Sequence, residues 1–322
     1  MKRLSPFAFL IGLALFILLL KMVDLHQTMT LLRAINPYWL AAALLLLIPE
    51  IFLKSLRLKT MASHFHSPLK LKDAIWTYMS GQPLSTFTPA KLGDVARVFG
   101  LSRLGHLSIT TAFSVHVADK VYDLMALGLL ASIGLIDLVI QSQNQTPAIA
   151  ALLGILLGIL LMALILHPNW MRSVLKPLLL TLAPKDLTSR IQTHGHEFYH
   201  HLQELFKPAG RVVQPTFYSL LAWEVALLRA YFCVLALGLP ISYGSVVLLL
   251  PVVIMVEFLP ISIMGFGTRE AALFIFFSSS LVGKSALLSF SFLMGLTGPI
   301  AFFILGIPAA MHLSDLLGRK TT

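Results

Sequence analysis

The stretch Thr88-Pro-Ala-Lys-Leu-Gly-Asp-Val-Ala-Arg97 is a short polar turn inside an otherwise apolar segment that covers about residues 74–104. A second apolar segment, about residues 250–283, is interrupted in the same way by Pro260-Ile-Ser-Ile-Met-Gly-Phe-Gly-Thr-Arg-Glu270. Each arm beside a turn has about 13 to 15 residues, fewer than the ~20 that a helix needs to cross a bilayer. The two segments therefore predict re-entrant helical hairpins, which hold polar backbone at membrane depth.

The composition is that of a membrane protein. Of the 322 residues, 57% are hydrophobic and 12% are charged, whereas soluble proteins carry about a quarter charged residues. Apolar segments and modest loops account for the length, which excludes a separate soluble catalytic domain of the usual ~100 residues. The net charge of +10 lies mainly in loops, so it indicates membrane topology and contact with anionic lipid and does not indicate a nucleic-acid partner.

Six other segments are long and apolar enough to span a bilayer. The first follows Met1-Lys-Arg3 and lacks an Ala-x-Ala-like cleavage site, so we expect an uncleaved helix instead of a signal peptide. The sequence predicts an all-α polytopic fold, with residues 1–322 forming a single transmembrane domain. The expected spans cover about residues 5–23, 37–56, 108–136, 147–167, 213–237 and 286–312.

The distribution of basic residues predicts the topology. The connection that holds Lys54 and Arg57 is basic, as is the one between Arg172 and Arg211, whereas residues 141–146 and 238–244 contain no Lys or Arg. Basic connections face the cytoplasm, which places both termini on the cytoplasmic side of a bacterial-type inner membrane. Three spans separate the two hairpins, so the hairpins should enter from opposite sides, as in an inverted-topology repeat.

The longest polar region, about residues 168–210, predicts an amphipathic helical loop at the cytoplasmic surface. We expect its apolar side chains to face lipid. These are Leu182, Leu187, Ile191, Phe198, Leu202 and Leu205.

Arg97 and Arg269, helped by Lys91, are the leading candidates for substrate binding. A guanidinium offers a planar fork of donors to phosphate or carboxylate oxygens. The N–H groups after a Gly-rich turn at a helix start favour the same anions, so an anionic headgroup is the expected ligand. The residues that shape the turns are Pro89, Gly93, Pro260, Gly265 and Gly267.

Both arginines also have carboxylates nearby in the sequence. Asp94 precedes Arg97, and Glu257 and Glu270 flank Arg269. These carboxylates either orient the arginines and exchange protons with them during transport, or form internal ion pairs that only shape the hairpins. Ionisable groups at membrane depth favour the functional interpretation.

A second polar group interrupts the predicted span at 108–136. Asp119 and Asp123 are four residues apart and share a helix face, so both could point at a hairpin arginine. The alternative is a helix end near the interface, where Lys120 extends its amine towards water. Further candidates inside the membrane are Glu50, Glu224 and Arg229.

Residues 196–200 read His-Glu-Phe-Tyr-His, the spacing with which zinc proteases bind metal and activate water. No downstream ligand has a recognised spacing, and His194 and His201 make the segment generally rich in histidine. We therefore treat His196 and His200 as weak metal candidates. No nucleotide or cofactor motif is present in the sequence, so no cofactor is predicted.

Three motifs together resemble the lysylphosphatidylglycerol synthase transmembrane, or flippase-like, family: Pro-x-x-Leu-Gly-acid-x-x-Arg at 89–97, basic-x-x-Asp at 120–123, and residues 260–270. In multiple peptide resistance factors this region is fused to a cytosolic aminoacyl-transfer domain and moves the aminoacylated lipid across the bilayer. The resemblance implies the flippase half alone. Asp94 stands where the family typically has glutamate, and Lys120 where arginine is common.

Sequence and resemblance together predict a lipid transporter that holds a headgroup in a charged cavity at the midplane. The expected partner is a membrane lipid: an anionic phospholipid, a polyprenyl-phosphate-linked lipid or a hopanoid. A second copy of the chain or a lipid-synthesis enzyme are further partners that the sequence leaves open. The competing hypotheses are a membrane-embedded transferase or hydrolase using Asp119, Asp123 or Glu257 as acid or base, and a zinc protease.

Overall fold

The computed structural model describes residues 18, 20–81, 94, 96–141, 185–207, 210–257, 265, 267–277 and 282–318. These residues form helices and connecting turns, and none of them lies in a strand. Three helical stretches are long and apolar enough to cross a membrane: Pro37–Ser63, Ile109–Leu138 and Gly210–Ala236. The prediction of an all-α membrane protein is confirmed, while the number of spans and the re-entrant layout stay predictions.

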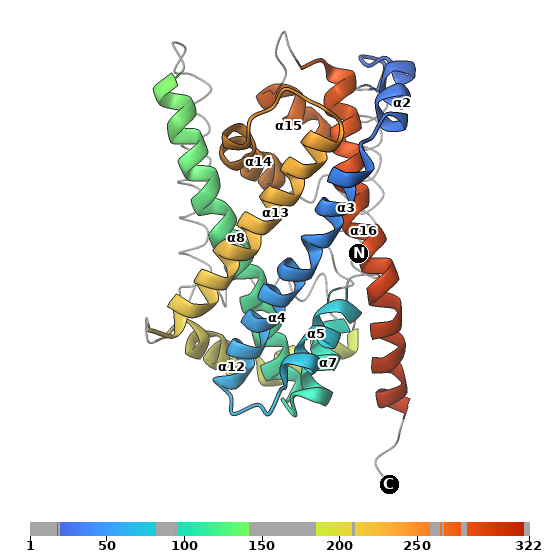
Figure 1. Ribbon diagram of the computed structural model, residues 1–322. Helices are drawn as coiled ribbons and strands as arrows, with labels where there is room; N and C mark the ends of the chain where they lie inside the picture. Colours follow the sequence, from blue (N-terminus) through green and yellow to red (C-terminus); the bar gives the residue numbers. More distant parts are fainter. Residues whose placement is uncertain are drawn as a thin grey trace.

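Long helices form the body of the molecule, and shorter ones gather at its two ends (Figure 1). The body consists of α3 and α4, which follow one another, with α8, α13 and α16. The bounds are α2 (Leu25–Arg33), α3 (Pro37–Leu45), α4 (Leu47–Ser63), α5 (Leu71–Ser80), α7 (Ala96–Leu104), α8 (Ile109–Gln141), α12 (Lys185–Phe206), α13 (Gly210–Ala236), α14 (Tyr243–Glu257), α15 (Thr268–Phe277) and α16 (Lys284–Gly318).

Four predicted spans coincide with long helices. The segment at 37–56 is α3 and α4 together and continues to Ser63, while 108–136 lies in α8, 213–237 coincides with α13 to within a few residues, and 286–312 lies in α16. Asn36 caps α3 by accepting the backbone N–H of Tyr38, and Pro37 occupies its first turn. The predicted span at 147–167, and nearly all of 5–23, fall outside the described residues.

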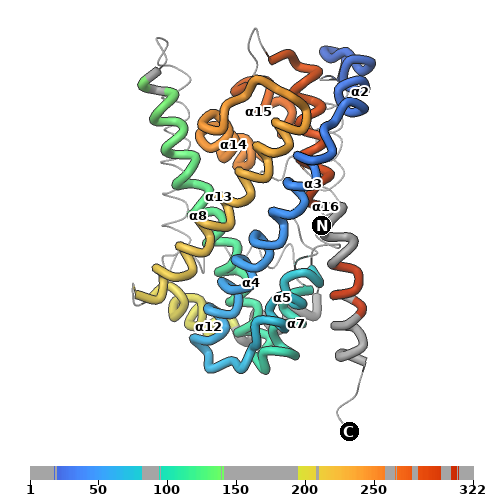
Figure 2. Tube along the Cα trace, viewed as in Figure 1, coloured from blue at the N-terminus to red at the C-terminus, as the bar shows by residue number. Residues whose placement is uncertain are grey.

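Each interrupted segment yields a pair of short helices. α5 packs against α7, and α14 packs against α15. The first pair lies at one end of the molecule and the second at the opposite end (Figure 2). Gly265 and Gly267 have φ of +76° and +87°, a conformation that favours glycine. Pro89, Lys91, Gly93 and Pro260 lie outside the described residues.

Helix α12 packs on protein, which corrects the expectation that its apolar side chains face lipid. Phe198, Leu202 and Leu205 are buried in a core formed with α4, α5, α7 and α8. The Phe198 ring lies 5.5 Å from that of Phe113 on α8. Packing against other helices stabilises α12 more than contact with lipid alone, because the interdigitated side chains also fix the position of the helix. Leu182 and the side chains of Leu187 and Ile191 lie outside the described part of the chain.

Candidate functional site

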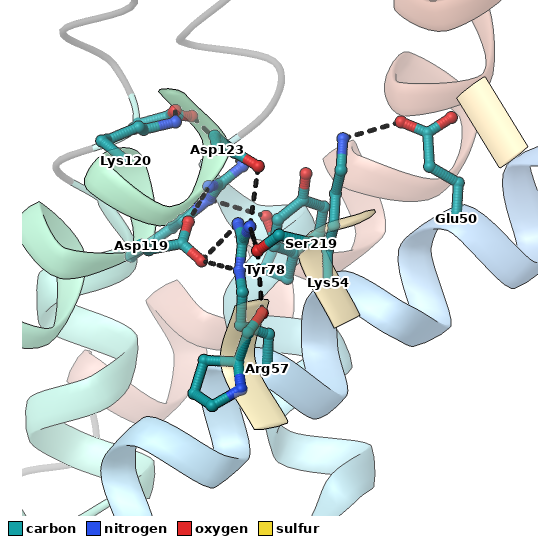
Figure 3. A network of polar contacts seen from close by, with 11 residues as sticks. Glu50, Lys54, Arg57, Tyr78, Asp119, Lys120, Asp123 and Ser219 are labelled. Atoms are coloured by element: carbon teal, nitrogen blue, oxygen red, sulfur yellow. Dashed lines mark hydrogen bonds and ion pairs between the residues drawn. The ribbon is translucent and has the colours of Figure 1, made fainter. Parts of the chain in front are cut away.

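Arg57 on α4 lies at the centre of a buried network of charges (Figure 3). Its Nε donates to Asp119 Oδ1 at 2.8 Å, and its Nη1 donates to Asp123 Oδ1 and to Ser219 Oγ, both at 2.7 Å. The Arg57 side chain is 0% exposed. Short charge-assisted hydrogen bonds to acceptors on α8 and α13 therefore hold this guanidinium and join α4, α8 and α13.

The placement of Arg57 and Lys54 in a basic cytoplasmic connection was wrong. Helix α4 continues through both residues to Ser63, and both side chains are buried. Glu50, Lys54 and Arg57 follow the i, i+4, i+7 spacing of one helix face. That spacing could have indicated that the helix continues with one charged face. A hydropathy criterion instead ends the predicted span where the first cations appear.

Asp119 connects Arg57 to the first of the two predicted arginines. Its second oxygen, Oδ2, lies 3.6 Å from Arg97 Nη1. Arg97 Nε donates to the carbonyl of Tyr78 at 3.1 Å, and the Tyr78 ring centroid lies 4.0 Å from the guanidinium carbon. Lys120 donates to Asp94. The expected role of Asp119 as a partner of a hairpin arginine is thus seen, whereas Asp123 contacts Arg57 on α4.

The carboxylates that face Arg97 hold it through ion pairs at long distances. Asp94 Oδ1 lies 3.3 Å from Nη2, and Asp119 Oδ2 lies 3.6 Å from Nη1. Both oxygens are buried and accept no hydrogen bond from the described residues. A charge-assisted hydrogen bond is shorter, about 2.7–2.9 Å. Among the described residues, the closest polar contact of Arg97 is therefore the bond from its Nε.

Arg269, the second predicted arginine, is held in a similar way. Its Nε donates to Ser291 Oγ on α16 at 2.8 Å, whereas Nη2 reaches Glu270 at 3.3 Å and Nη1 reaches Glu257 at 3.9 Å. Glu270 in turn accepts the backbone N–H of Gly267 at 2.6 Å, at the start of α15. Its carboxylate therefore orients the turn as well as the arginine.

Glycines let other parts of the chain approach both arginines closely. A Cβ added to Gly81 would lie 2.9 Å from Arg97 Cγ, and one added to Gly295 would lie 2.8 Å from Arg269 Nη2. Each arginine begins the second helix of a short pair and contacts the long helix that follows, α8 or α16. The two sites are thus built from equivalent elements.

A further set of charges links α4 to α13 and α16. Glu50 bonds Lys54 at 2.7 Å and Arg229 at 3.2 Å, and Arg229 donates to Thr297 at 3.1 Å. Glu224 accepts the hydroxyl of Tyr243. Of the additional membrane candidates, Glu50 and Arg229 therefore pair with each other, while Glu224 joins α13 to α14.

Comparison with known families fits this arrangement. The profile of the lysylphosphatidylglycerol synthase TM region matches residues 7–306. The chain belongs to this family. It is an integral membrane protein, related through the family to lipid modification or transport. Among curated proteins, no match to the sequence is found.

The matched region of this lysylphosphatidylglycerol synthase TM protein contains both groups of candidate residues. The structure brings Asp94, Arg97, Asp119, Lys120 and Asp123 together. It separately joins Glu257, Arg269 and Glu270, and these two sets of partners have no residue in common. Three members of the network were missed by sequence reasoning, namely Lys54, Arg57 and Ser219.

Proposed function

We propose that the protein is a lipid transporter that moves an anionic or phosphate-bearing headgroup across the cytoplasmic membrane. The supporting observation is the state of the two turn arginines. Each donates from Nε to an uncharged acceptor, and its outer nitrogens lie 3.3–3.9 Å from carboxylates of the described residues. A phosphate can form shorter, bidentate bonds to the same nitrogens. It can therefore replace the carboxylates without moving the arginine backbone.

The charge balance suggests how a headgroup would enter the first site. Among the described residues, Arg57, Arg97 and Lys120 contact three carboxylates, Asp94, Asp119 and Asp123. In this proposal, an anion that binds Arg97 displaces one of its carboxylates, so that the buried charges stay paired. Asp94 is the carboxylate suited to move away from Arg97, because Lys120 still compensates its charge through the other oxygen. Arg57 is held by short bonds to both carboxylates of α8 and serves as the fixed anchor of the site.

We further propose a single transmembrane domain with two oppositely oriented re-entrant hairpins, at about 74–104 and 250–283. The location of α5–α7 and α14–α15 at opposite ends supports this inverted layout (Figure 2). α12 and the C-terminal end of α16 lie at the same end as α5–α7 (Figure 1). In this proposal that end is cytoplasmic, because the basic connections flank it.

A transferase or hydrolase mechanism fits the geometry less well. Asp119 and Asp123 are tied to Arg57 by short hydrogen bonds. A carboxylate oxygen that already accepts a short hydrogen bond from a guanidinium is not free to take a proton from a substrate. A transporter needs no such group, since it leaves its lipid chemically intact. A path lined with paired charges lowers the cost of carrying a charged headgroup through hydrocarbon, which is several kcal/mol or more.

The test is headgroup translocation in proteoliposomes with a panel of labelled anionic and polyprenyl-phosphate lipids. Arg97→Ala and Arg269→Ala should each lower the initial rate at least about tenfold, the change expected when an interaction worth about 1.4 kcal/mol is lost. Arg103→Ala is the matched control, because Arg103 is exposed on the same helix as Arg97 and should transport normally.

Circular dichroism should show that the variants are folded, and mass spectrometry that the moved lipid is unaltered. The proposal fails if no lipid of the panel moves, or if its mass changes. It fails equally if the two arginine variants transport as fast as Arg103→Ala.

A further inference from the structure

A pocket rich in histidine lies away from the charge network, where three segments meet. It has a volume of about 420 Å³. His64 and His66 line it from the connection after α4, and His106 lines it from the connection between α7 and α8. Helix α12 contributes His201 and Glu204. Imidazole and carboxylate groups gathered in one place are typical ligands of divalent transition metals.

Three side chains of α12 already lie close enough to share one ion. The ligand atoms of His200, His201 and Glu204 all lie within 4.8 Å of one another, and His200 Nδ1 lies 3.9 Å from Glu204 Oε2. Around a tetrahedral zinc ion with bonds of ~2.0–2.1 Å, ligand atoms stand about 3.3 Å apart. Small rotations of the exposed side chains would shorten the separations between ligand atoms to those around zinc, since His200 is 62% and Glu204 41% exposed.

A hydrogen bond from a neighbouring helix orients one of these ligands. Thr111 Oγ1 on α8 lies 3.2 Å from His201 Nδ1, and the ring of Phe65 packs edge-on against the same imidazole at 5.1 Å. When Nδ1–H donates to the threonine, Nε2 keeps its lone pair for a metal. Outer partners of this kind fix the tautomer and direction of ligating histidines.

Two histidines of the pocket wall have left-handed backbone. His66 and His106 have φ of 55° and 51°. Each follows the end of a helix, α4 or α7, where a left-handed residue commonly ends the helix. Both residues line the pocket, so two helix ends bring imidazoles to the cavity beside α12.

We propose that His200, His201 and Glu204 bind a divalent transition-metal ion such as Zn²⁺, with water or a histidine of the pocket wall as the fourth ligand. This site differs from the motif seen in the sequence, which pairs His196 with His200. His196 is exposed and is not part of the group of close ligand atoms. The ion would join α12 to the start of α8 through His201, independently of lipid transport.

The experiment uses the full-length chain, purified with a tag that contains no histidine and stripped of metal. Calorimetric titration with Zn²⁺ should show one ion bound per chain, and Co²⁺ should give visible absorption bands of a low-symmetry nitrogen and oxygen site. His200→Ala and Glu204→Gln should each weaken Zn²⁺ binding at least tenfold, and His201→Ala should abolish the Co²⁺ bands.

The matched control is His196→Ala, an exposed histidine of the same helix, which should bind Zn²⁺ like the unchanged protein. Unfolding temperatures without metal should agree among His196→Ala, His200→Ala and Glu204→Gln, because these three side chains are at least partly exposed on α12. The proposal is overturned if less than one equivalent of Zn²⁺ binds. It is also overturned if His196→Ala weakens binding as much as His200→Ala, which would assign the metal to the motif at 196–200.

Discussion

At the scale of single residues, Arg57, Arg97 and Arg269 differ in how they are held. Arg57 uses short bonds to Asp119, Asp123 and Ser219, whereas Arg97 and Arg269 are anchored at Nε and meet carboxylates at longer distances. Removing an anchor leaves buried carboxylates uncompensated and destabilises the fold. Arg97 and Arg269 are also buried beside carboxylates, so their alanine variants need the check of folding given above. Burial alone does not distinguish these roles.

Asp94→Asn should strengthen binding of anionic lipid, because it keeps the shape of the side chain while removing a negative charge from Arg97 and Lys120. If a phosphate replaces Asp94 at Arg97, the variant binds its lipid more tightly and releases it more slowly. We expect several-fold more phospholipid to remain bound after purification, and slower transport.

Phosphorus analysis of the purified protein and the transport rate measure these two effects. Asp73→Asn, in the first turn of α5, is the control and should change neither. An Asp94→Asn variant that retains less lipid than the unchanged protein would contradict the displacement of Asp94.

At the scale of elements, helices α8 and α14 approach each other unusually closely at Gly134. A Cβ at this position would lie 1.7 Å from the carbonyl oxygen of Leu248. Contact between two backbones cannot be relieved by turning a side chain, so any larger residue has to push the helices apart. Glycine here serves packing, as small residues do between membrane helices.

Gly134→Ala should therefore lower the free energy of unfolding by about 1–3 kcal/mol, the usual cost of overpacking. Gly128→Ala, two turns earlier on α8, meets nothing within 4 Å. It should be neutral or stabilising by up to about 1 kcal/mol, since alanine favours helix over glycine. Unfolding of both variants in detergent, followed by circular dichroism, gives the comparison. Equal stability of the two would show that α8 and α14 adjust freely.

At the scale of the whole molecule, the two pairs of short helices, α5–α7 and α14–α15, lie at opposite ends and are built alike. A pair of short helices is followed by a long one, the second short helix begins with the arginine, and a glycine faces that arginine. If the halves share one transport mechanism, matched changes in the two should have matched effects.

Gly81→Ala and Gly295→Ala should each slow transport several-fold, because the added methyl group presses on Arg97 or Arg269 and disturbs its outer contacts. Gly283→Ala meets nothing within 4 Å and is the control. The proteoliposome assay described above measures all three. An effect confined to one of the two positions would argue against equivalent roles for the halves.

The sequence by itself determined the class of protein, the approximate places of four long helices, and the two interruptions that Arg97 and Arg269 follow. These features depend on hydropathy and on short-range rules for turns and helix starts, which act over a few residues. The spacing of Asp119 and Asp123 likewise placed two carboxylates on one helix face.

Only the tertiary structure decided which charges meet. Arg57 pairs with Asp119, 62 residues away, and with Ser219, 162 residues away. Likewise, Phe198 and Leu202 turned out to pack on protein and not on lipid. Local patterns show that a side chain needs a partner or an apolar neighbour. The partner itself depends on how helices far apart in the chain pack, because every buried charge has to find its counterion within the assembled fold.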